Sequence, residues 1–317
     1  RFLSQWSAEV RAMRRSILQR AAEAFSPDLM IVDKRPAGID EELLDTLTTL
    51  RQRGTRLVLG VRDILDHPTR TRPLLEETNT FELIDRHYDE VWIYGTSDVF
   101  DHLGNYGYPA SAADRTTYTG YLRRPVAPRT PRGPIPRVLV TTGGGEDGEQ
   151  MIHTYLEGLR RLPDRHELRT TVVFGPQLAD VKRDALIARY GRLENVEFHD
   201  FVADLTRHYA AADLVVAMAG YNTVCELLSF GHRAVLVPRS EPVQEQLIRA
   251  RRLHEMGRFD LVEPSELTPR RLMSKVLAQL EPGSRPVSSI DLDGLSTIRG
   301  RVRSLLTERA SWLPAAS

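Results

Sequence analysis

Short apolar runs alternate with amphipathic stretches along the first third of the chain. Four runs have the length and apolar character of buried strands: 29–32, 57–60, 91–94 and 118–121. Helices are predicted between them, over 40–53 and 73–87. A further helix is predicted ahead of the first strand, because apolar residues recur there every three or four positions: Leu3, Trp6, Val10, Met13 and Ile17. Strands that alternate with helices indicate parallel βαβ units.

A segment rich in proline and arginine then interrupts the pattern, over 124–136. Its prolines stand close together: Pro125, Pro128, Pro131, Pro134 and Pro136. Proline at this density removes backbone donors and fixes the backbone, so the segment reads as a stiff linker. The alternative is a long surface loop within one domain. A complete second α/β pattern follows it, which favours the linker.

The second pattern supplies enough strands for a doubly wound, Rossmann-like sheet. Its predicted strands are 137–140, 171–174, 196–198, 214–217, 234–237 and 260–262. A last amphipathic helix is predicted over 295–306. The domains expected are 1–123, the linker 124–136, 137–290, and a C-terminal helix and tail over 291–317.

Composition narrows the class of protein. Apolar content of 41% and charged content of 27% are typical of a globular chain. Lys+Arg and Asp+Glu both number 43, so nucleic acid is not expected as a partner. Because Cys225 is the single cysteine, an internal disulfide cannot form and a cytoplasmic location is expected. No sequence run reaches the ~18 apolar residues that span a bilayer.

The chain opens on a helix, whereas an α/β domain usually opens on a strand. The N-terminal domain is therefore expected to be incomplete, without its first strand and the loop that follows it. The opening helix also carries Arg11, Arg14, Arg15 and Arg20 beside its apolar stripe. Such a face permits peripheral contact with an anionic membrane. The alternative is a helix packed on its own sheet with a solvated basic face.

A glycine turn marks the start of the second domain. Gly143, Gly144 and Gly145 follow a predicted strand and precede a predicted helix. Without side chains, such a turn lets backbone amides approach a phosphate at a helix N-terminus. A tight turn that needs positive φ explains the same glycines. Glu146 and Asp147 argue against a bound phosphate, unless they cap the helix or accept hydrogen bonds from sugar hydroxyls.

A second group of polar residues follows the strand over 214–217. Thr223 and Glu226 have the spacing of a capping box, which predicts a helix N-terminus at this point. Glu226 either caps that helix or accepts both hydroxyls of a ribose. Arg239, at the end of the next strand, is a candidate to neutralise a diphosphate, and a solvated surface arginine is its alternative. The pair Glu245–Gln246 stands at the following helix start.

These residues resemble a known family. The segments 212–216, 220–226, 234–238 and 245–246 resemble the C-terminal half of MurG-like glycosyltransferases, glycosyltransferase family 28. Gly143–Gly145, 220–223 and 237–239 are still more similar to a bacterial group known as predicted glycosyl transferases. Motifs of the first half resemble the same group: 32–34, 59–66, 88–95 and 118–121.

The resemblance implies a GT-B fold, in which two Rossmann-like domains face a cleft, and a donor that is usually a UDP-sugar. It implies that the glycine turn and 220–222 line the diphosphate and that Glu226 binds the ribose. Phe201 and Val202 would hold the base, while Glu245 and Gln246 would reach the donor sugar. The candidate donor-binding residues are Gly143, Gly144, Gly145, Phe201, Val202, Ala219, Gly220, Tyr221, Asn222, Thr223, Glu226, Arg239, Glu245 and Gln246.

The family places a histidine-bearing glycine loop after its first strand, and no such loop precedes Phe2. The general base is therefore sought among Asp63, Asp66 and His67, with Arg62 keeping Asp63 ionised or oriented. A surface salt bridge and a turn before a proline account for the same residues. We expect no cofactor and no metal, and the acceptor is not specified.

Two rival functions stay open. Sugar-nucleotide epimerases and some hydrolases share this architecture, and a protein that only binds sugar nucleotides would carry the same motifs.

Overall fold

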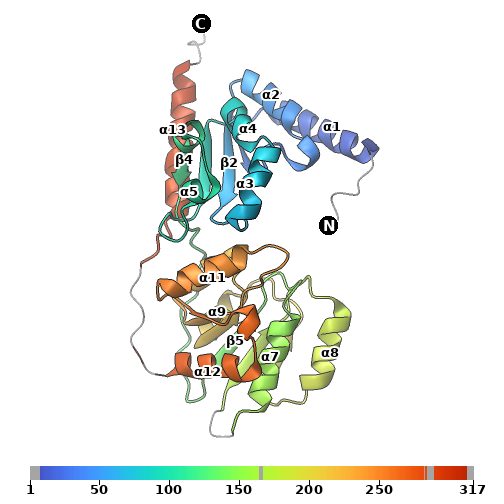
Figure 1. Cartoon of the computed structure of the whole chain (residues 1–317), viewed down its shortest axis with the longest axis vertical. Helices are drawn as coiled ribbons and strands as arrows, with labels where there is room; N and C mark the ends of the chain where they lie inside the picture. The colour runs from blue at the N-terminus through green and yellow to red at the C-terminus, as the bar shows by residue number, and fades with distance from the viewer. Residues whose placement is uncertain (1–7, 164–166, 282, 284–288, 313–317) are drawn as a thin grey trace. The chain divides into compact units, whose positions relative to one another are not determined.

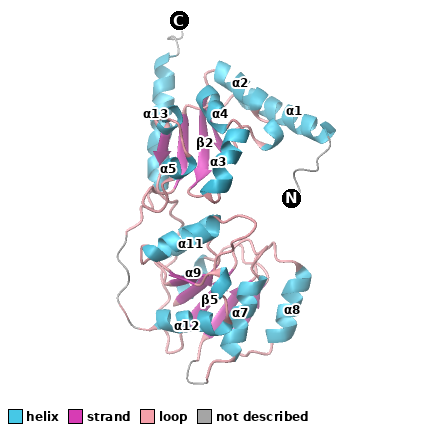
Figure 2. Ribbon diagram, in the orientation of Figure 1, coloured by secondary structure: helices cyan, strands magenta, loops and turns pink. Residues whose placement is uncertain are grey.

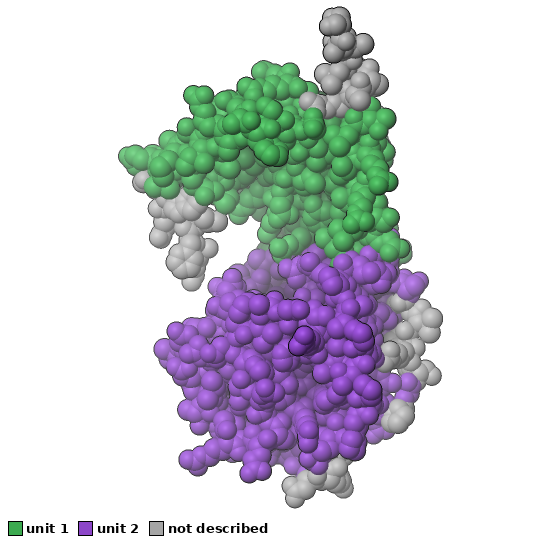
Figure 3. All heavy atoms as spheres, turned by 180° about the vertical axis from the view of Figure 1, so that it is seen from behind, with its two compact units in different colours: residues 1–122, 293–317 green, residues 123–292 purple. Residues whose placement is uncertain are grey.

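The computed structural model describes residues 8–163, 167–281, 283 and 289–312. It separates the chain into two compact units, residues 1–122 with 293–317 and residues 123–292 (Figure 3). Both units are α/β, with strands covered by helices (Figure 2). Within the described residues, every helix is too short or too polar to span a bilayer.

The first unit contains a parallel four-stranded sheet in the order β1-β2-β3-β4. Its elements are α1 (Ala8–Phe25), β1 (Leu29–Asp33), η1 (Ile39–Glu41), α2 (Leu44–Gln52), β2 (Arg56–Arg62), α3 (Pro68–Glu77), α4 (Thr80–His87), β3 (Glu90–Tyr94), α5 (His102–Tyr106), α6 (Ala110–Ala113), β4 (Thr116–Tyr118) and α13 (Gly294–Trp312).

Helices from both ends of the sequence cover this sheet (Figure 1). Leu47 and Leu50 of α2 pack with Leu57 and Leu59 of β2 in one apolar cluster. On the other face, Leu305 of α13 packs with Val58 and Trp92. The C-terminal helix thus belongs to the first unit, although the sequence analysis set 291–317 apart.

An ion pair fixes α13 to the sheet. Glu90, at the start of β3, is buried and accepts a hydrogen bond from Trp92 Nε1 at 2.6 Å. Arg301 of α13 donates to both Glu90 carboxylate oxygens, with Nε at 2.9 Å from Oε2 and Nη2 bonded to Oε1. A helix more than 200 residues later in the chain is therefore held to β3 by a charge-assisted contact.

The second unit contains a parallel six-stranded sheet in the order β10-β9-β8-β5-β6-β7, the doubly wound arrangement that the strand count predicted. Its elements are β5 (Arg137–Thr141), α7 (Glu149–Arg160), β6 (Arg169–Val173), α8 (Asp180–Tyr190), β7 (Val196–His199), α9 (Thr206–Ala211), β8 (Leu214–Ala217), α10 (Tyr221–Phe230), β9 (Ala234–Leu236), α11 (Glu245–Glu255), β10 (Asp260–Leu261), η2 (Pro264–Glu266) and α12 (Pro269–Leu280). Consecutive strand residues such as Leu139 and Val140, whose side chains point to opposite faces of the sheet, are both buried, because helices cover both faces.

The segment 124–136 contains no helix or strand, and it lies on the second unit. Thr130 N donates to Ala210 O at 2.9 Å, and Arg129 Nη2 lies 2.8 Å from His232 Nδ1. Arg124 N donates to Ser229 Oγ at 2.9 Å. These bonds attach the segment along most of its length, which the proline spacing did not reveal.

Several predicted elements differ in detail from the observed ones. The single helix predicted over 73–87 is two helices, since Asn79 adopts a left-handed φ of 49° between α3 and α4. The helix predicted from residue 40 begins at Leu44, because Asp40 also has positive φ. The strand predicted over 118–121 ends at Tyr118. The predicted first helix runs from Ala8 to Phe25, and Leu3 and Trp6 lie outside the described residues.

Candidate functional site

The candidate site lies at the carboxyl edge of the second sheet. β5 is central, and its neighbours β6 and β8 belong to the two halves of the sheet that are wound in opposite directions. Thr141, the last residue of β5, is paired in register with Val173 of β6 and Ala217 of β8. The chain therefore leaves these three strands at one level, at the switch point where open α/β sheets bind ligands.

The glycine turn connects β5 to α7 at this edge. Gly143 and Gly145 have φ of 67° and 97°, which supports the tight-turn interpretation at these two positions. A Cβ at Gly145 would lie 2.6 Å from Phe174 O, so the turn also needs close backbone contact with the β6 loop. Gln177 N donates to Gly144 O at 2.8 Å. α7 then begins at Glu149 with Gly148 as N-cap and no side-chain cap.

The second turn meets the first. Gly220 is the N-cap of α10, and this helix start also lacks a side-chain cap. Thr223, in the first turn of α10, approaches the glycine turn so closely that a Cβ at Gly143 would lie 3.0 Å from its Oγ1. The structure thus places the glycine turn, which leads into α7, against the first turn of α10.

The capping-box prediction was wrong. The helix begins at Tyr221, before Thr223, and Thr223 is not its N-cap. Glu226 instead accepts a hydrogen bond from Tyr209 Oη at 2.9 Å. Burial raises the pKa of Glu226, and the Tyr209 hydrogen bond and the positive charge of Arg124 oppose this rise. Glu226 is thus an oriented, half-buried carboxylate one turn into α10.

Arg239 lies between two acidic residues. Its Nη1 is 2.7 Å from Asp147 Oδ2, and its Nη2 is 3.5 Å from Glu245 Oε1. The side chain is not a freely solvated arginine, because only 25% of it is exposed. The charge of Asp147, which argued against a phosphate at the glycine turn, is therefore paired with the charge of Arg239.

Other predicted donor-site residues occupy the same edge or the loops beside it. Gln246 is buried, with Oε1 at 3.5 Å from Arg239 N. Asn222 Oδ1 accepts a hydrogen bond from Arg124 Nη2 at 2.7 Å. Phe201, 59% exposed, follows β7 in a loop whose Asp200 O accepts a bond from Gly175 N at 3.1 Å. Val202 is half-buried in that loop. The assignment of Phe201 and Val202 to the base stays a prediction.

The candidate catalytic residues lie at the carboxyl end of β2 in the first unit. Asp63 is buried, and its two oxygens accept hydrogen bonds from Tyr121 Oη at 2.7 Å and Ile64 N at 2.8 Å. Arg62 is half-buried at the end of the strand. These contacts hold the Asp63 carboxylate in place. Roles for Asp63 and Arg62 in the reaction stay predictions.

Asp66 and His67 stabilise the N-terminus of α3. Asp66 Oδ1 accepts a bond from His67 N at 2.7 Å, and Asp66 Oδ2 lies 3.8 Å from Arg70 Nη1. His67 is the N-cap of α3, where its Nδ1 accepts from Thr69 N. The alternative of a salt bridge and a turn before Pro68 therefore describes this segment.

Arg249 and Tyr209 were missed by the sequence analysis. Arg249 is fully buried and donates from Nη1 to Ala219 O at 2.8 Å. A helical signal for it was available, since Arg249 follows Glu245 by four residues and precedes the buried Leu253 by four. Tyr209 had no comparable signal, because α9 and α10 meet only in the folded unit.

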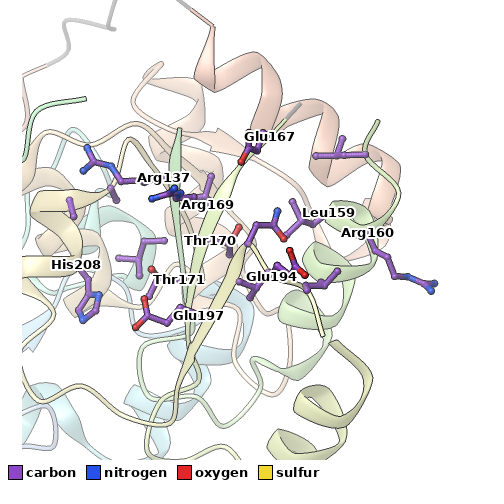
Figure 4. A pocket seen from close by; sticks show the side chains of 18 of the residues that line it. Arg137, Leu159, Arg160, Glu167, Arg169, Thr170, Thr171, Glu194, Glu197 and His208 are labelled. Atoms are coloured by element: carbon purple, nitrogen blue, oxygen red, sulfur yellow. The ribbon is translucent and has the colours of Figure 1, made fainter. Parts of the chain in front are cut away.

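A separate hollow of about 1010 Å³ opens at the opposite edge of this sheet (Figure 4). Arg137 and Arg169 line it from the amino ends of β5 and β6, and Glu194 and Glu197 line it beside and on β7. Its charges are mixed, and the amino edge is not where open α/β sheets bind ligands. The glycine turn lies at the other end of the strands. In the described parts of the chain, no cluster of three or more His, Cys, Asp or Glu side chains could hold a metal.

Comparison with known proteins assigns the second unit. Residues 138–291 match the model of the glycosyltransferase family 28 C-terminal domain. They form a MurG-like domain of that family. The family match spans the glycine turn, the start of α10 and Arg239, which are the residues that carried the resemblance.

Curated relatives agree with this domain assignment. Over 139 residues the chain is 31% identical to a UDP-N-acetylglucosamine--N-acetylmuramyl-(pentapeptide) pyrophosphoryl-undecaprenol N-acetylglucosamine transferase of Haemophilus influenzae (strain PittGG), a match covering 44% of this chain and 38% of the relative. The enzyme of the same name from Methylobacterium nodulans is 33% identical over 174 residues, covering 52% of this chain and 47% of the relative. These matches span less than half the length of each relative.

Solved structures extend the likeness to both units. MurG of Acinetobacter baumannii superposes with a TM-score of 0.55 at 18% identity, covering 97% of this chain and 76% of that one. A putative UDP-N-acetylglucosamine 2-epimerase of Listeria monocytogenes gives a TM-score of 0.62 at 14% identity, covering 99% and 83%. At these identities the likeness shows the fold, which is GT-B, as the family-28-like motifs implied.

Proposed function

We propose that this chain is a glycosyltransferase that moves a sugar from a nucleoside-diphosphate donor, a UDP-sugar, to an acceptor hydroxyl without a metal ion. The observation that supports this proposal is the contact between the glycine turn, which leads into α7, and the first turn of α10 at the switch point of the family 28 domain. Neither helix start has a side-chain cap. The positive ends of both helices favour a diphosphate there. The names of the curated relatives, transferases of a UDP-linked sugar, support this choice.

In this proposal the acceptor hydroxyl attacks the anomeric carbon of the donor sugar while the C–O bond to the diphosphate breaks. Negative charge grows on the leaving diphosphate, where the two helix N-termini and Arg239 stabilise it. Glu226 accepts hydrogen bonds from the ribose hydroxyls, and Tyr209 holds the carboxylate for that purpose. Glu245 and Gln246, at the start of α11, contact the donor sugar in this proposal. Asp63 of the first unit is the candidate proton acceptor.

A panel of UDP, GDP, dTDP and their sugars tests the donor site. Ligand at about 100 times its dissociation constant stabilises the folded protein by about 2.7 kcal/mol. We expect UDP and UDP-sugars to raise the melting temperature of the wild type. We expect Glu226→Ala to bind UDP at least tenfold more weakly, because a ribose contact is lost, about 1.4 kcal/mol. Glu263→Ala on the same unit is the control, since the Glu263 carboxylate pairs with the exposed Arg251.

Two results would contradict the proposal. A wild-type protein that no nucleotide stabilises would contradict the proposed donor site. An unchanged UDP affinity in Glu226→Ala would contradict the proposed ribose contact. Incubation with a UDP-sugar alone separates the rival activities. Epimerised sugar, or free sugar released at turnover rates without acceptor, would favour the epimerase or hydrolase that the structural neighbours also permit. Tight UDP binding without turnover of any acceptor would favour a binding protein.

We also propose that α1 makes peripheral contact with an anionic membrane surface, at the inner face of a cytoplasmic membrane. Met13 and Ile17 are 57% and 59% exposed, four residues apart on α1. Arg15 and Arg20 are exposed on the same helix. Apolar side chains flanked by arginines suit the interface of an anionic bilayer.

Sedimentation with vesicles of anionic and of neutral phospholipid tests this contact. We expect the wild type to pellet with anionic vesicles, and we expect Met13→Ser with Ile17→Ser to weaken that binding several-fold. A double substitution of the exposed residues Val181 and Ile187 on α8 is the control. Equal pelleting of the wild type and the α1 variant would remove α1 as the membrane contact.

A further inference from the structure

The buried arginine of α11 is the basis of a further inference about the donor site. Arg249 has no exposed side-chain surface, although it carries a permanent charge. Arginine is almost never fully buried unless its charge is paired and its N–H groups are bonded. The groups that Arg249 contacts therefore indicate which part of the structure its charge stabilises.

Those partners belong to the donor-site loops. Arg249 Nη1 donates to Ala219 O at 2.8 Å, in the turn between β8 and α10. Its Nη2 lies 3.8 Å from Glu245 Oε2, one helical turn earlier on α11. Its guanidinium carbon lies 5.8 Å from the centre of the Tyr221 ring, at the first residue of α10. One side chain thus contacts both ends of the turn before α10 and the acidic residue at the start of α11.

The charges continue from Arg249 to the glycine turn. Glu245 is shared, since its Oε1 lies 3.5 Å from Arg239 Nη2. Arg239 in turn bonds Asp147, at 2.7 Å, just before α7. Acidic and basic groups therefore alternate along one path, which joins the starts of α7, α11 and α10. This path passes through residues that the proposed function assigns to the diphosphate and the sugar.

We propose that Arg249 is a positioning residue for the nucleoside-diphosphate donor, and this inference rests on the proposed function. Arg249 holds the 219–221 turn in place before the donor binds, so the amides at the start of α10 are already oriented. It also takes part of the charge of Glu245. Without Arg249, Glu245 binds Arg239 more fully, so less of the Arg239 charge is left to stabilise a bound diphosphate.

The variants Arg249→Met and Arg249→Lys test this inference. Methionine keeps an unbranched apolar stem and removes the charge. Lysine keeps the charge but cannot present a planar fork to Ala219 and Glu245 at once. Arg251→Met, on the same helix, is the matched control, because Arg251 is exposed and pairs with Glu263. UDP is the probe, its dissociation constant is measured by calorimetry, and thermal melting reports the fold of each variant.

We expect folded Arg249→Met to bind UDP at least tenfold more weakly than the wild type, Arg249→Lys to fall between them, and Arg251→Met to match the wild type. A folded Arg249→Met with UDP affinity within twofold of the wild type would overturn the inference. If Arg249→Met does not fold, Arg249→Lys decides: wild-type affinity overturns the inference and weakened affinity supports it. A wild type that binds no UDP instead overturns the proposed function, so the two failures are distinguishable.

Discussion

Replacing Gly145 by alanine should lower the stability of the second unit by about 2–4 kcal/mol and abolish the UDP-induced melting shift. Gly145 has φ of 97°, where an L side chain is strained, and its Cβ would lie 2.6 Å from Phe174 O. The colliding atom belongs to the backbone at the end of β6, so it cannot turn aside as a side chain would. The glycine turn would have to shift away from the loop after β6.

Gly144→Ala is the matched control for this prediction. Its Cβ would meet the end of the flexible Gln177 side chain, with Oε1 at 2.8 Å and Cδ at 3.6 Å. We expect its melting temperature to stay close to that of the wild type, with a cost of less than about 1 kcal/mol. Calorimetric melting with and without UDP measures both effects. Equal melting temperatures for the two variants would show that the Gly145 backbone is not constrained as the structure indicates.

Replacing Arg301 by alanine should destabilise the first unit by about 2–3 kcal/mol, because it leaves the buried Glu90 carboxylate without its cation. The side chain of Glu90 is only 8% exposed, whereas that of Arg301 is 42% exposed, so the cost should fall below that of a fully buried pair. Trp92 Nε1 also donates a hydrogen bond to the Glu90 carboxylate. Urea unfolding followed by tryptophan fluorescence should therefore report the loss of stability.

Arg303→Ala is the control on the same helix, because Arg303 is exposed on α13. We expect its free energy of unfolding to stay within about 0.5 kcal/mol of the wild type. Combining Arg301→Met with Glu90→Gln removes both charges, and this pair should recover part of the lost stability. An Arg301→Ala protein as stable as the wild type would show that α13 is held by its apolar contacts alone.

Local patterns predicted most of the strands, because apolar runs between turn signals mark buried strands, whereas the run 118–121 shares only Tyr118 with β4. The second half illustrates this: the runs 214–217 and 234–237 agree closely with β8 and β9. Positions that depend on positive φ at residues other than glycine were not predicted. Asn79, which separates α3 from α4, is one such residue, and only the folded backbone shows its conformation.

The candidate site divides in the same way. The residues of the glycine turn and the α10 start were found because strand, turn and helix follow one another directly in the sequence. The pairing of Asp147 with Arg239 joins residues 92 positions apart, so no local pattern could resolve whether the acidic residue opposes a phosphate. Glu226 shows the limit of motif spacing, because Tyr209 from α9 binds the carboxylate that the spacing assigned to a cap.

The sequence by itself determined two α/β units, the order of their elements and the family to which the second unit's motifs belong, because these features depend on periodicity and on neighbouring residues. Only the tertiary structure decided that α13 returns to the first sheet, that the glycine turn meets the first turn of α10, and that Arg249 is buried against the turn before α10. Each of these depends on contacts between residues far apart in the chain, and such contacts are chosen by packing and charge pairing after the local elements have formed.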